Sequence, residues 1–383
     1  MSDAPKIKKA KMDPAALAKA GQLDVDAAFA SATRMPTPVA PGAIDLDKEA
    51  PAVGALANDA FDRMRRRASG EERALPLPWP SLADALGGGL WSGLHVVVGS
   101  TGTGKSQLTL QMALHAAEQG IPVLYCGLEL GRVDLVARLL GLLDQRKWSN
   151  LWLGKGRDNE DPVLEIDRLQ EKHGPKLATL PFHLAFAKPY GWSYELLHPY
   201  ADALRKRYRD RLVDANGKPT QPFLVVLDFL QLVSGPEDDT GQDLRERIQQ
   251  AAYAGRAIAR DMDAAVVFVS GTARENYREL DGRPAKGEKE ASGPKFGEGN
   301  PSRLVGLGKE SGEIEFAADS VLTLCREPWK DKEPEDGTHI WLALAKARAR
   351  GDSAAAQRGW VELRFNGGWF SEPKPLNRTK TVG

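Results

Sequence analysis

The sequence is poor in cysteine, and its charges show no excess of either sign. Cys126 and Cys325 are its two cysteines, and both lie in apolar runs. This placement indicates small buried thiols in a reduced protein, and it excludes a disulfide framework or a cysteine-based metal site. The 52 basic residues are matched by 52 acidic ones, which excludes a uniformly basic nucleic-acid coat, so any nucleic-acid contact must be local.

Long hydrophobic runs and a leader sequence are also missing. The longest apolar runs, such as 223–232, are too short to span a bilayer, and the N-terminus has no apolar signal core. The six histidines are scattered without ligand spacing, which argues against structural zinc. We therefore expect a cytoplasmic protein with no membrane partner.

The N-terminal region lacks the apolar content that a folded domain needs. Residues 1–54 are rich in Ala, Pro, Asp and Lys, so we predict a disordered tail whose basic cluster, 6–11, is solvated. The segment 55–75 is predicted as a linker with a helix over 55–68. The apolar residues near one face of that helix are Leu56, Ala60, Phe61 and Met64. The arginine run 65–67 is expected to be a solvated face.

From about residue 76 the sequence alternates between strand and helix patterns. The predicted strands are 94–98, 121–128, 222–232 and 264–270, and the predicted helices are 107–118, 133–143, 192–208 and 244–262. This alternation predicts an α/β fold with a mostly parallel central sheet flanked by helices. Three later strands with short connections, 320–325, 339–345 and 360–365, are predicted as antiparallel additions at the edge. The long segment 271–308, dense in Gly, Pro and charge, is predicted to be functional or disordered.

The most informative motif is the phosphate-binding pattern G-x-x-x-x-G-K-[ST], placed between a predicted strand and a predicted helix. Its residues are Gly99, Ser100, Thr101, Gly102, Thr103, Gly104, Lys105 and Ser106. The backbone N–H groups and the positive end of the helix dipole then point at one place, which creates an anion site. We expect Lys105 to reach the β- and γ-phosphates of a nucleotide and the Ser106 hydroxyl to bind Mg²⁺.

Two carboxylates are placed to complete this chemistry. Asp228 ends an all-apolar strand, where an unpaired buried carboxylate is costly, and we interpret it as the Walker B acid that holds Mg²⁺ through water. Glu129 ends the strand next in sequence to the phosphate-loop helix, and we interpret it as the group that orients the attacking water. The alternative for Glu129 is a capping acid for the helix 133–143.

In order along the chain, several segments resemble the RecA-like ATPase domain of the DnaB-type hexameric helicases. Besides the phosphate loop, they are Gly127-Leu128-Glu129-Leu130, the Leu-Asp-Phe-Leu-Gln-Leu element at 227–232, Ser270 to Arg274, the Glu-Ser-Gly-x-Ile-Glu-x-x-Ala-Asp segment at 310–319, Ala345 to Arg348, and 363–368. The 227–232 and 310–319 segments are the most family-specific. The resemblance covers about 76–371, predicts a RecA-like P-loop NTPase domain there, and leaves 372–383 as a tail.

The resemblance implies the cofactors, roles and partners of such a motor. ATP and Mg²⁺ would bind at the phosphate loop and Asp228, and Glu129 would be the catalytic carboxylate. Lys346 and Arg348 match a basic pair that reaches the γ-phosphate in the neighbouring subunit's site, although a solvated strand end is the alternative. The implied partners are copies of the same chain in a hexameric ring, single-stranded DNA, and a loader or replication-initiator protein.

The chain departs from the family pattern in three ways. Gly271 stands where the family usually carries a glutamine after Ser270, and Thr272 or Arg274 are the nearest substitutes. The following segment is close to neutral, although it holds the DNA-loop candidates Arg274, Arg278 and Arg283. The helical N-terminal domain of replicative DnaB is absent from the sequence, so we take the helix 55–68 as the candidate ring-forming element.

We therefore interpret the chain as a DnaB-like, ring-forming ATPase that moves on single-stranded DNA, in the replication of a plasmid, phage or mobile element. Two alternatives stay open. One is a RecA- or KaiC-like ATPase that assembles without unwinding, and the other is an ATP-gated oligomeric binding module. A P-loop kinase for a small metabolite would leave the landmarks after Asp228 unexplained.

Overall fold

The computed structural model describes residues 45–155, 161–186, 192–235, 243–273, 276–281, 296–307, 312–328, 337–349, 351 and 354–373. The chain divides after Ala57 into two units. The first contains the short helix α3 (Leu46–Glu49), and helix α4 (Val53–Ser69) runs across the division. The predicted basic cluster 6–11 lies outside the described residues.

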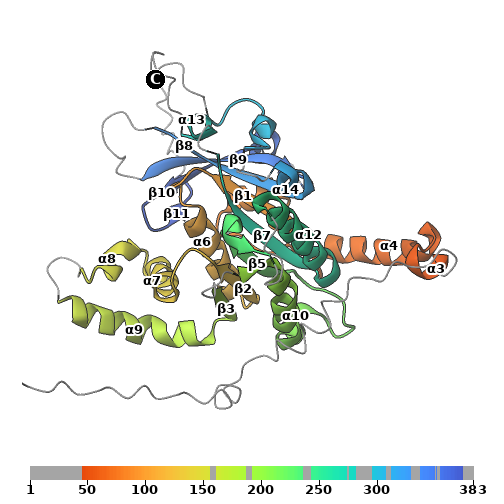
Figure 1. Ribbon diagram of the computed structural model, residues 1–383. Helices are drawn as coiled ribbons and strands as arrows, with labels where there is room; N and C mark the ends of the chain where they lie inside the picture. Colours follow the sequence, from red (N-terminus) through yellow and green to blue (C-terminus); the bar gives the residue numbers. More distant parts are fainter. Residues whose placement is uncertain are drawn as a thin grey trace, which may run out of the picture. The chain divides into compact units, whose positions relative to one another are not determined.

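A nine-stranded mixed sheet, ordered β11-β10-β9-β8-β1-β7-β5-β2-β3, organises the second unit (Figure 1). Its strands are β1 (Gly93–Gly99), β2 (Val123–Gly127), β3 (Phe182–Phe186), β5 (Phe223–Asp228), β7 (Ala264–Gly271), β8 (Ser320–Arg326), β9 (Thr338–Ala347), β10 (Trp360–Phe365) and β11 (Phe370–Ser371). The six strands from β8 to β3 pair in parallel, and β9, β10 and β11 pair antiparallel. The predicted fold class is confirmed.

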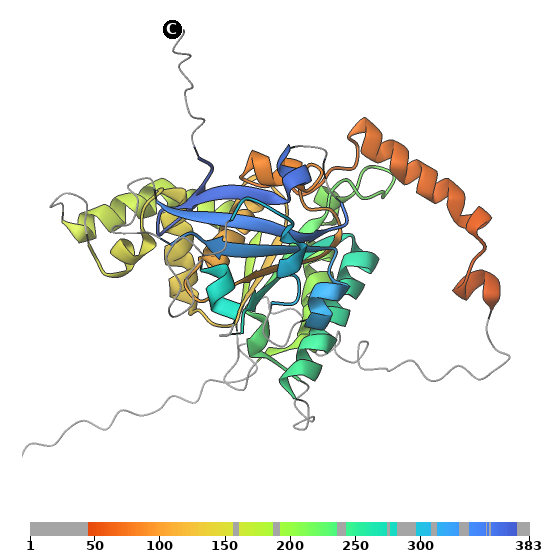
Figure 2. The same cartoon turned by 90° about the horizontal axis from the view of Figure 1, so that it is seen from above.

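Helices cover both faces of the sheet, with α6 and α12 on opposite sides (Figure 2). The helices are α5 (Pro80–Ala85), α6 (Lys105–Glu118), α7 (Arg132–Leu143), α8 (Trp148–Trp152), α9 (Pro162–Thr179), α10 (Leu197–Arg207), α11 (Arg209–Leu212), α12 (Leu244–Met262), α13 (Tyr277–Leu280), α14 (Gly312–Ala317) and α15 (Ala354–Arg358). α12 begins at the predicted residue because Asp243 and Glu246 form a reciprocal capping box. No helix in the described part of the chain is long and apolar enough to cross a membrane.

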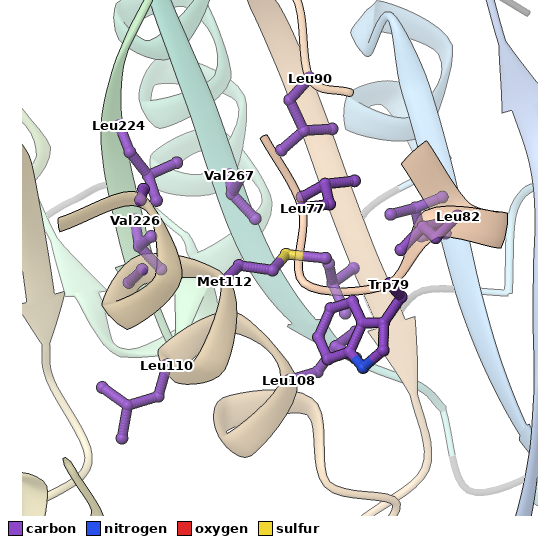
Figure 3. Close-up of a cluster of buried hydrophobic side chains, with 14 of the residues drawn as sticks. Leu77, Trp79, Leu82, Leu90, Leu108, Leu110, Met112, Leu224, Val226 and Val267 are labelled. Carbon is purple, nitrogen blue, oxygen red and sulfur yellow. The ribbon is translucent and has the colours of Figure 1, made fainter. Parts of the chain in front are cut away.

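The core between α6 and the sheet fixes where the phosphate loop lies. Met112 of α6 is surrounded by side chains of β5 and β7, including Val226 and Val267, and by Trp79 from the segment before α5 (Figure 3). All four are almost fully buried. Because close-packed interiors resist displacement, this contact holds α6 against the central strands and so fixes the loop that precedes it.

The structure corrects three predicted elements. The strand 320–325 is not an antiparallel edge strand, because β8 lies beside β1 in parallel and only its other neighbour, β9, is antiparallel. The predicted strand 222–232 ends at Asp228 and continues as a 3₁₀ turn, Leu230–Leu232. The predicted helix 192–208 starts only at Leu197, because Trp192–Ser193 pairs with Val233–Ser234 as β4 and β6.

The arginine run 65–67 lies within α4 and is not the uniformly solvated face that the sequence predicts. Arg66 is buried, and its guanidinium donates to the Pro219 carbonyl. Arg63 and Arg67 each bind the buried carboxylate of Glu72, at 3.0 and 2.9 Å. The C-terminal turns of α4, which belong to the second unit, are therefore held by ion pairs with Glu72.

The prediction of buried free thiols is confirmed. Cys126 and Cys325 are both buried and form no disulfide. Burial raises the pKa of each thiol, so neither is a nucleophile at neutral pH.

Candidate functional site

A cavity of about 1010 Å³ opens at the carboxyl ends of β1, β2, β5 and β7. In open α/β sheets this edge is where ligands bind, because the loops after parallel strands converge there. The cavity is lined by Thr101, Gly102, Gly104, Lys105, Ser106, Gln107, Glu129, Leu130, Arg138, Trp148, Asp228, Phe229, Val269, Gly271, Thr272, Ala273, Asn276, Tyr277, Gly306 and Phe365.

The phosphate loop has the backbone that an anion cradle requires. Gly102 and Gly104 have positive φ angles of 81° and 89°, which side-chain-bearing residues rarely adopt. At Gly104 a Cβ would also lie 2.8 Å from the ring of Phe370, so only glycine fits. The chain then enters α6 at Lys105, and the first turn of that helix faces the cavity with N–H groups that the helix itself does not pair.

Lys105 is held inside the cradle. Its ammonium group donates to the Ser100 carbonyl at 2.9 Å. Burial lowers the pKa of Lys105 to about 8, although the carboxylates of Asp228, Glu129 and Asp281 act to raise it. A half-buried cation beside the backbone donors of a helix start is chemically suited to a polyphosphate.

Asp228 is presented by the end of β5 and is held by hydroxyl groups on two sides. The Ser106 hydroxyl donates to one carboxylate oxygen at 3.1 Å, and the Tyr125 hydroxyl donates to the other at 2.7 Å. Burial raises the pKa of Asp228, whereas these two hydrogen bonds and Lys105 act to lower it. A hydroxyl and a carboxylate oxygen side by side are the hard oxygen ligands that a hydrated Mg²⁺ accepts.

Glu129 follows the end of β2 and lies exposed at the rim of the same cavity. The capping alternative is wrong, because α7 begins after Gly131, which is its N-cap residue. The structure thus brings together the phosphate loop, Asp228 and Glu129 as the sequence predicts.

Sequence reasoning missed two residues of this site, Arg138 and Tyr125. The Arg138 guanidinium lies 4.1 Å from the centre of the Trp148 ring and donates to Gln107 Oε1 at 3.4 Å. Burial lowers the pKa of Arg138, with Tyr125 and Asp228 opposing that change. The available signal was an arginine that interrupts the apolar face of a predicted helix. For Tyr125, no local signal distinguishes it from the other buried residues of its strand.

Lys346 and Arg348 lie away from this cavity. β9 runs antiparallel to β8, so its carboxyl end is level with the amino end of β1. The Arg348 N–H donates to the Asp319 carbonyl, and the Asp319 N–H donates to the Leu94 carbonyl. Leu94 precedes Gly99 by five residues, which is about 16 Å along the strand. The structure therefore does not place this pair at the phosphate loop of its own chain.

The Ala-Asp end of the 310–319 segment orients Arg348. The Asp319 carboxylate accepts from the Arg348 guanidinium at 2.7 Å and from the Leu94 N–H at 2.9 Å. Lys346 donates to the Glu315 carbonyl at 3.2 Å. The Arg348 side chain is nevertheless 54% exposed, so it is held in place and still accessible from outside the chain. Glu310 and Ser311 lie outside the described residues.

The end of β7 explains the glycine at position 271. A Cβ there would lie 3.2 Å from the Phe229 ring, so a side chain at this position requires the ring to shift. The Gly271 N–H donates to Gln231 Oε1, and Gln231 donates to Ser270 at 2.9 Å. Of the DNA-loop candidates, Arg274 and Arg283 lie outside the described residues, as does the side chain of Arg278.

Comparisons with known proteins agree with this geometry. The family model of the DnaB-like helicase C-terminal domain matches residues 78–369. The replicative DNA helicase DnaB of Geobacillus stearothermophilus is 25% identical over 125 residues, which are 33% of this chain. The match spans only 23% of that relative's length.

Two solved structures have the same fold. One, described as an ATPase domain, aligns with a TM-score of 0.62 and 18% identity, covering 84% of this chain and 99% of that one. The other, a DnaB-like replicative helicase whose structure was described with its interactions with primase, aligns with a TM-score of 0.61 and 17% identity. That alignment covers 84% of this chain and 67% of the helicase.

Proposed function

We propose that this chain, which belongs to the DnaB-like helicase C-terminal domain family, is an ATP-hydrolysing, ring-forming motor acting on single-stranded DNA. The observation that carries the proposal is the division of the site. The phosphate loop, Asp228 and Glu129 share one cavity, whereas the half-buried Lys346 and the exposed Arg348 lie at the other end of the strands.

The described residues fit Mg²⁺ and ATP. Gly99 to Gly104 and Lys105 would hold the phosphates, and Ser106 with Asp228 would hold Mg²⁺, Asp228 through water. When bound, Mg²⁺ neutralises charge that develops on the phosphates during transfer. Tyr125 keeps the Asp228 carboxylate oriented, since its hydroxyl bonds the carboxylate oxygen that Ser106 does not.

Glu129 is the residue that we assign to the attacking water. Its carboxylate is exposed at the cavity and is close enough to Lys105 to act on the pKa of that residue. A carboxylate in this position accepts a hydrogen bond from water and so orients it for attack. The nearby Arg138 adds positive charge to the same cavity.

Assembly would supply the missing cations. A trans-acting arginine stabilises the charge of phosphoryl transfer, and it makes hydrolysis depend on a neighbour. We assign this role to Lys346 and Arg348, and we assign the ring contact to α4. That helix exposes Phe61 by 55% and Met64 by 64% in the single chain, whereas its Arg63, Arg66 and Arg67 already have partners within the chain. We also assign to this chain a loader or replication-initiator protein as the partner that would place such a ring on DNA.

The experiment that tests the proposal measures the ATPase rate with and without single-stranded DNA, together with the particle mass in ATP. We expect stimulation by DNA and an oligomeric mass, and a Phe61→Ser, Met64→Ser double variant should remain monomeric with an unchanged melting temperature. A monomeric wild-type chain that DNA does not stimulate would exclude the motor.

A second candidate function is an ATP-gated oligomeric module that does not translocate. The specific observation in its favour is Gly271, which provides no side chain between the phosphate site and the chain after β7. ATP-dependent assembly and turnover without DNA stimulation would favour this candidate.

A further inference from the structure

A strongly basic surface lies where α10 ends and α11 begins. Five of the seven residues from 205 to 211 are basic, and all five are exposed: Arg205, Lys206, Arg207, Arg209 and Arg211. We call these five residues the basic surface of α10 and α11. Because basic and acidic residues balance over the whole chain, this surface is a local excess of positive charge.

The charge of its arginines is not neutralised by ion pairs. Lys206 pairs with Asp202 at 2.6 Å. None of the four arginines has a carboxylate within ion-pair distance in the part of the chain that the structure describes. The surface therefore attracts anions from solution, with a strength that falls as salt is added.

Backbone carbonyls at the ends of two other helices place the guanidinium groups. Arg205 donates to the Asp261 carbonyl in the last turn of α12 at 3.5 Å, and Arg211 donates to the Gly120 carbonyl just after α6 at 3.4 Å. These acceptors carry no net charge, and a guanidinium has five N–H donors. The arginines are thus oriented while most of their donors remain available to a ligand.

Tyr208 brings two of the arginines together around one aromatic ring. The guanidinium carbons of Arg207 and Arg211 lie 5.8 and 5.3 Å from the centre of that ring. The Tyr208 hydroxyl is hydrogen-bonded to His183 Nε2 at 2.9 Å. Burial lowers the pKa of His183, and the positive charge of Arg207 acts in the same direction. Aromatic rings interleaved with arginines are typical of surfaces that bind single-stranded nucleic acid.

This surface is separate from the phosphate cavity. Gly120, which accepts from Arg211, lies three residues before the start of β2. The basic surface is therefore at the amino ends of the parallel strands, whereas the cavity is at their carboxyl ends. The five residues of β2 alone separate the two by about 17 Å.

The chemistry of the surface favours a phosphodiester backbone over a protein partner. Among the described residues 197–212, no large apolar side chain is exposed, whereas the core of a protein interface is apolar and poor in charge. Guanidinium groups match phosphate oxygens, because two parallel N–H donors can bind one phosphate.

We propose that the basic surface of α10 and α11 is an additional DNA-binding site, which holds the phosphodiester backbone of a strand without reading its base sequence. The inference goes beyond the proposed function, since it concerns a strand outside the phosphate cavity and does not require ATP to bind.

The test measures the affinity for a labelled oligothymidine of about 20 nucleotides by fluorescence anisotropy, without nucleotide, over a range of salt concentrations. In an Arg205→Gln, Arg207→Gln, Arg209→Gln triple variant we expect affinity to fall by about tenfold at low salt. The slope of log affinity against log salt should become shallower by about 2, because each of three lost phosphate contacts releases about 0.7 counterion. A duplex of equal length is tested alongside, and loss of either complex supports the site.

A matched triple variant controls for net charge. Arg73→Gln, Lys155→Gln, Arg358→Gln removes three exposed basic residues elsewhere in the described chain. It should bind DNA with the affinity and salt slope of the wild type, and both triple variants should keep the wild-type melting temperature. Lys105→Ala should also bind as the wild type does, because this site does not use the phosphate loop.

A second readout locates the bound strand. Irradiation of the same oligonucleotide carrying bromodeoxyuridine should give an adduct on Tyr208 in the wild type and in the control variant, and none in the Arg205, Arg207, Arg209 variant. Equal binding and equal adducts in both triple variants would overturn the site. Displacement of the DNA by a polyglutamate peptide of equal charge, at equal concentration, would also overturn it in favour of an acidic protein partner.

The two proposals can fail separately. If the wild type hydrolyses no ATP but the basic surface binds DNA as expected, the proposed function fails and this site stands. If DNA stimulates ATP turnover but the two triple variants behave alike, this site is overturned and the motor stands.

Discussion

At the scale of single residues, the site is built from groups that are unfavourable until a ligand arrives. Lys105 is a half-buried cation whose ammonium group is held by a backbone carbonyl. Asp228 is a buried carboxylate that two hydroxyl groups keep in place. Such pairs of desolvated, opposite charges are typical of functional sites. The sequence predicts both residues, because each belongs to a motif, but their environment depends on Tyr125 and Arg138, which no motif marks.

The depressed pKa of Lys105 predicts how nucleotide binding depends on pH. Free Lys105 loses its proton near pH 8, and bound phosphates would keep it charged, so binding takes up a proton above that pH. We expect the dissociation constant for ATP to rise by about tenfold between pH 7 and pH 9. Calorimetry in two buffers of different ionisation enthalpy should show proton uptake at pH 9 and almost none at pH 7. Equal affinities at both pH values would contradict the assignment.

At the scale of elements, the sequence predicts best where the pattern is local. The helix over 244–262 is found at its predicted bounds because its capping residues and its period are both in the sequence. The strand over 320–325 and its antiparallel neighbour β9 are predicted, but its parallel pairing with β1 is not, because that pairing joins segments far apart along the chain. The burial of Arg66 is not predicted for the same reason, because its partner, the Pro219 carbonyl, is distant in sequence.

The ion pairs of α4 predict a large effect from one carboxylate. Glu72→Ala leaves the buried guanidinium of Arg66 and those of Arg63 and Arg67 without their shared partner. We expect the free energy of unfolding to fall by about 3 kcal/mol, because the buried Arg66 loses its ionic partner and keeps only the Pro219 carbonyl. Chemical denaturation checks this. The neighbouring Glu71 is exposed, so Glu71→Ala should change little, and an equal loss in both variants would argue against the ion pairs.

At the scale of the whole molecule, the sheet separates what the proposed chemistry must bring together. Family resemblance predicts the roles of Lys346 and Arg348, but only the antiparallel course of β9 shows that they lie about 16 Å along the strands from their own phosphate loop. The spacing of the motifs along the sequence does not predict that distance. The same holds for the contacts of Tyr277 and Asp281 with the phosphate loop, which join segments about 180 residues apart.

This separation predicts complementation between two inactive proteins. Arg348→Ala removes the cation offered to a neighbour, and Glu129→Ala removes the carboxylate of the chain's own cavity. Each variant alone should lose nearly all ATP turnover, like Lys105→Ala. Mixing Arg348→Ala with Glu129→Ala should restore part of the rate, because some contacts then join an intact cavity to an intact cation pair. Mixing Lys105→Ala with Glu129→Ala should restore nothing, since both changes damage the same cavity.

The position of the cation pair at the carboxyl end of β9 has a consequence for how the assembly ends. A contact that joins cavity to cation pair is directional, so a row of chains always leaves one cavity uncompleted at one end and one cation pair idle at the other. A longer row lowers the fraction of chains with an uncompleted cavity but never brings it to zero. Closure removes both ends in one step. The ATP turnover per chain would then distinguish a filament from a ring without any image. In a filament it would rise gradually with the number of chains, whereas in a ring it would reach its full value when the ring closes.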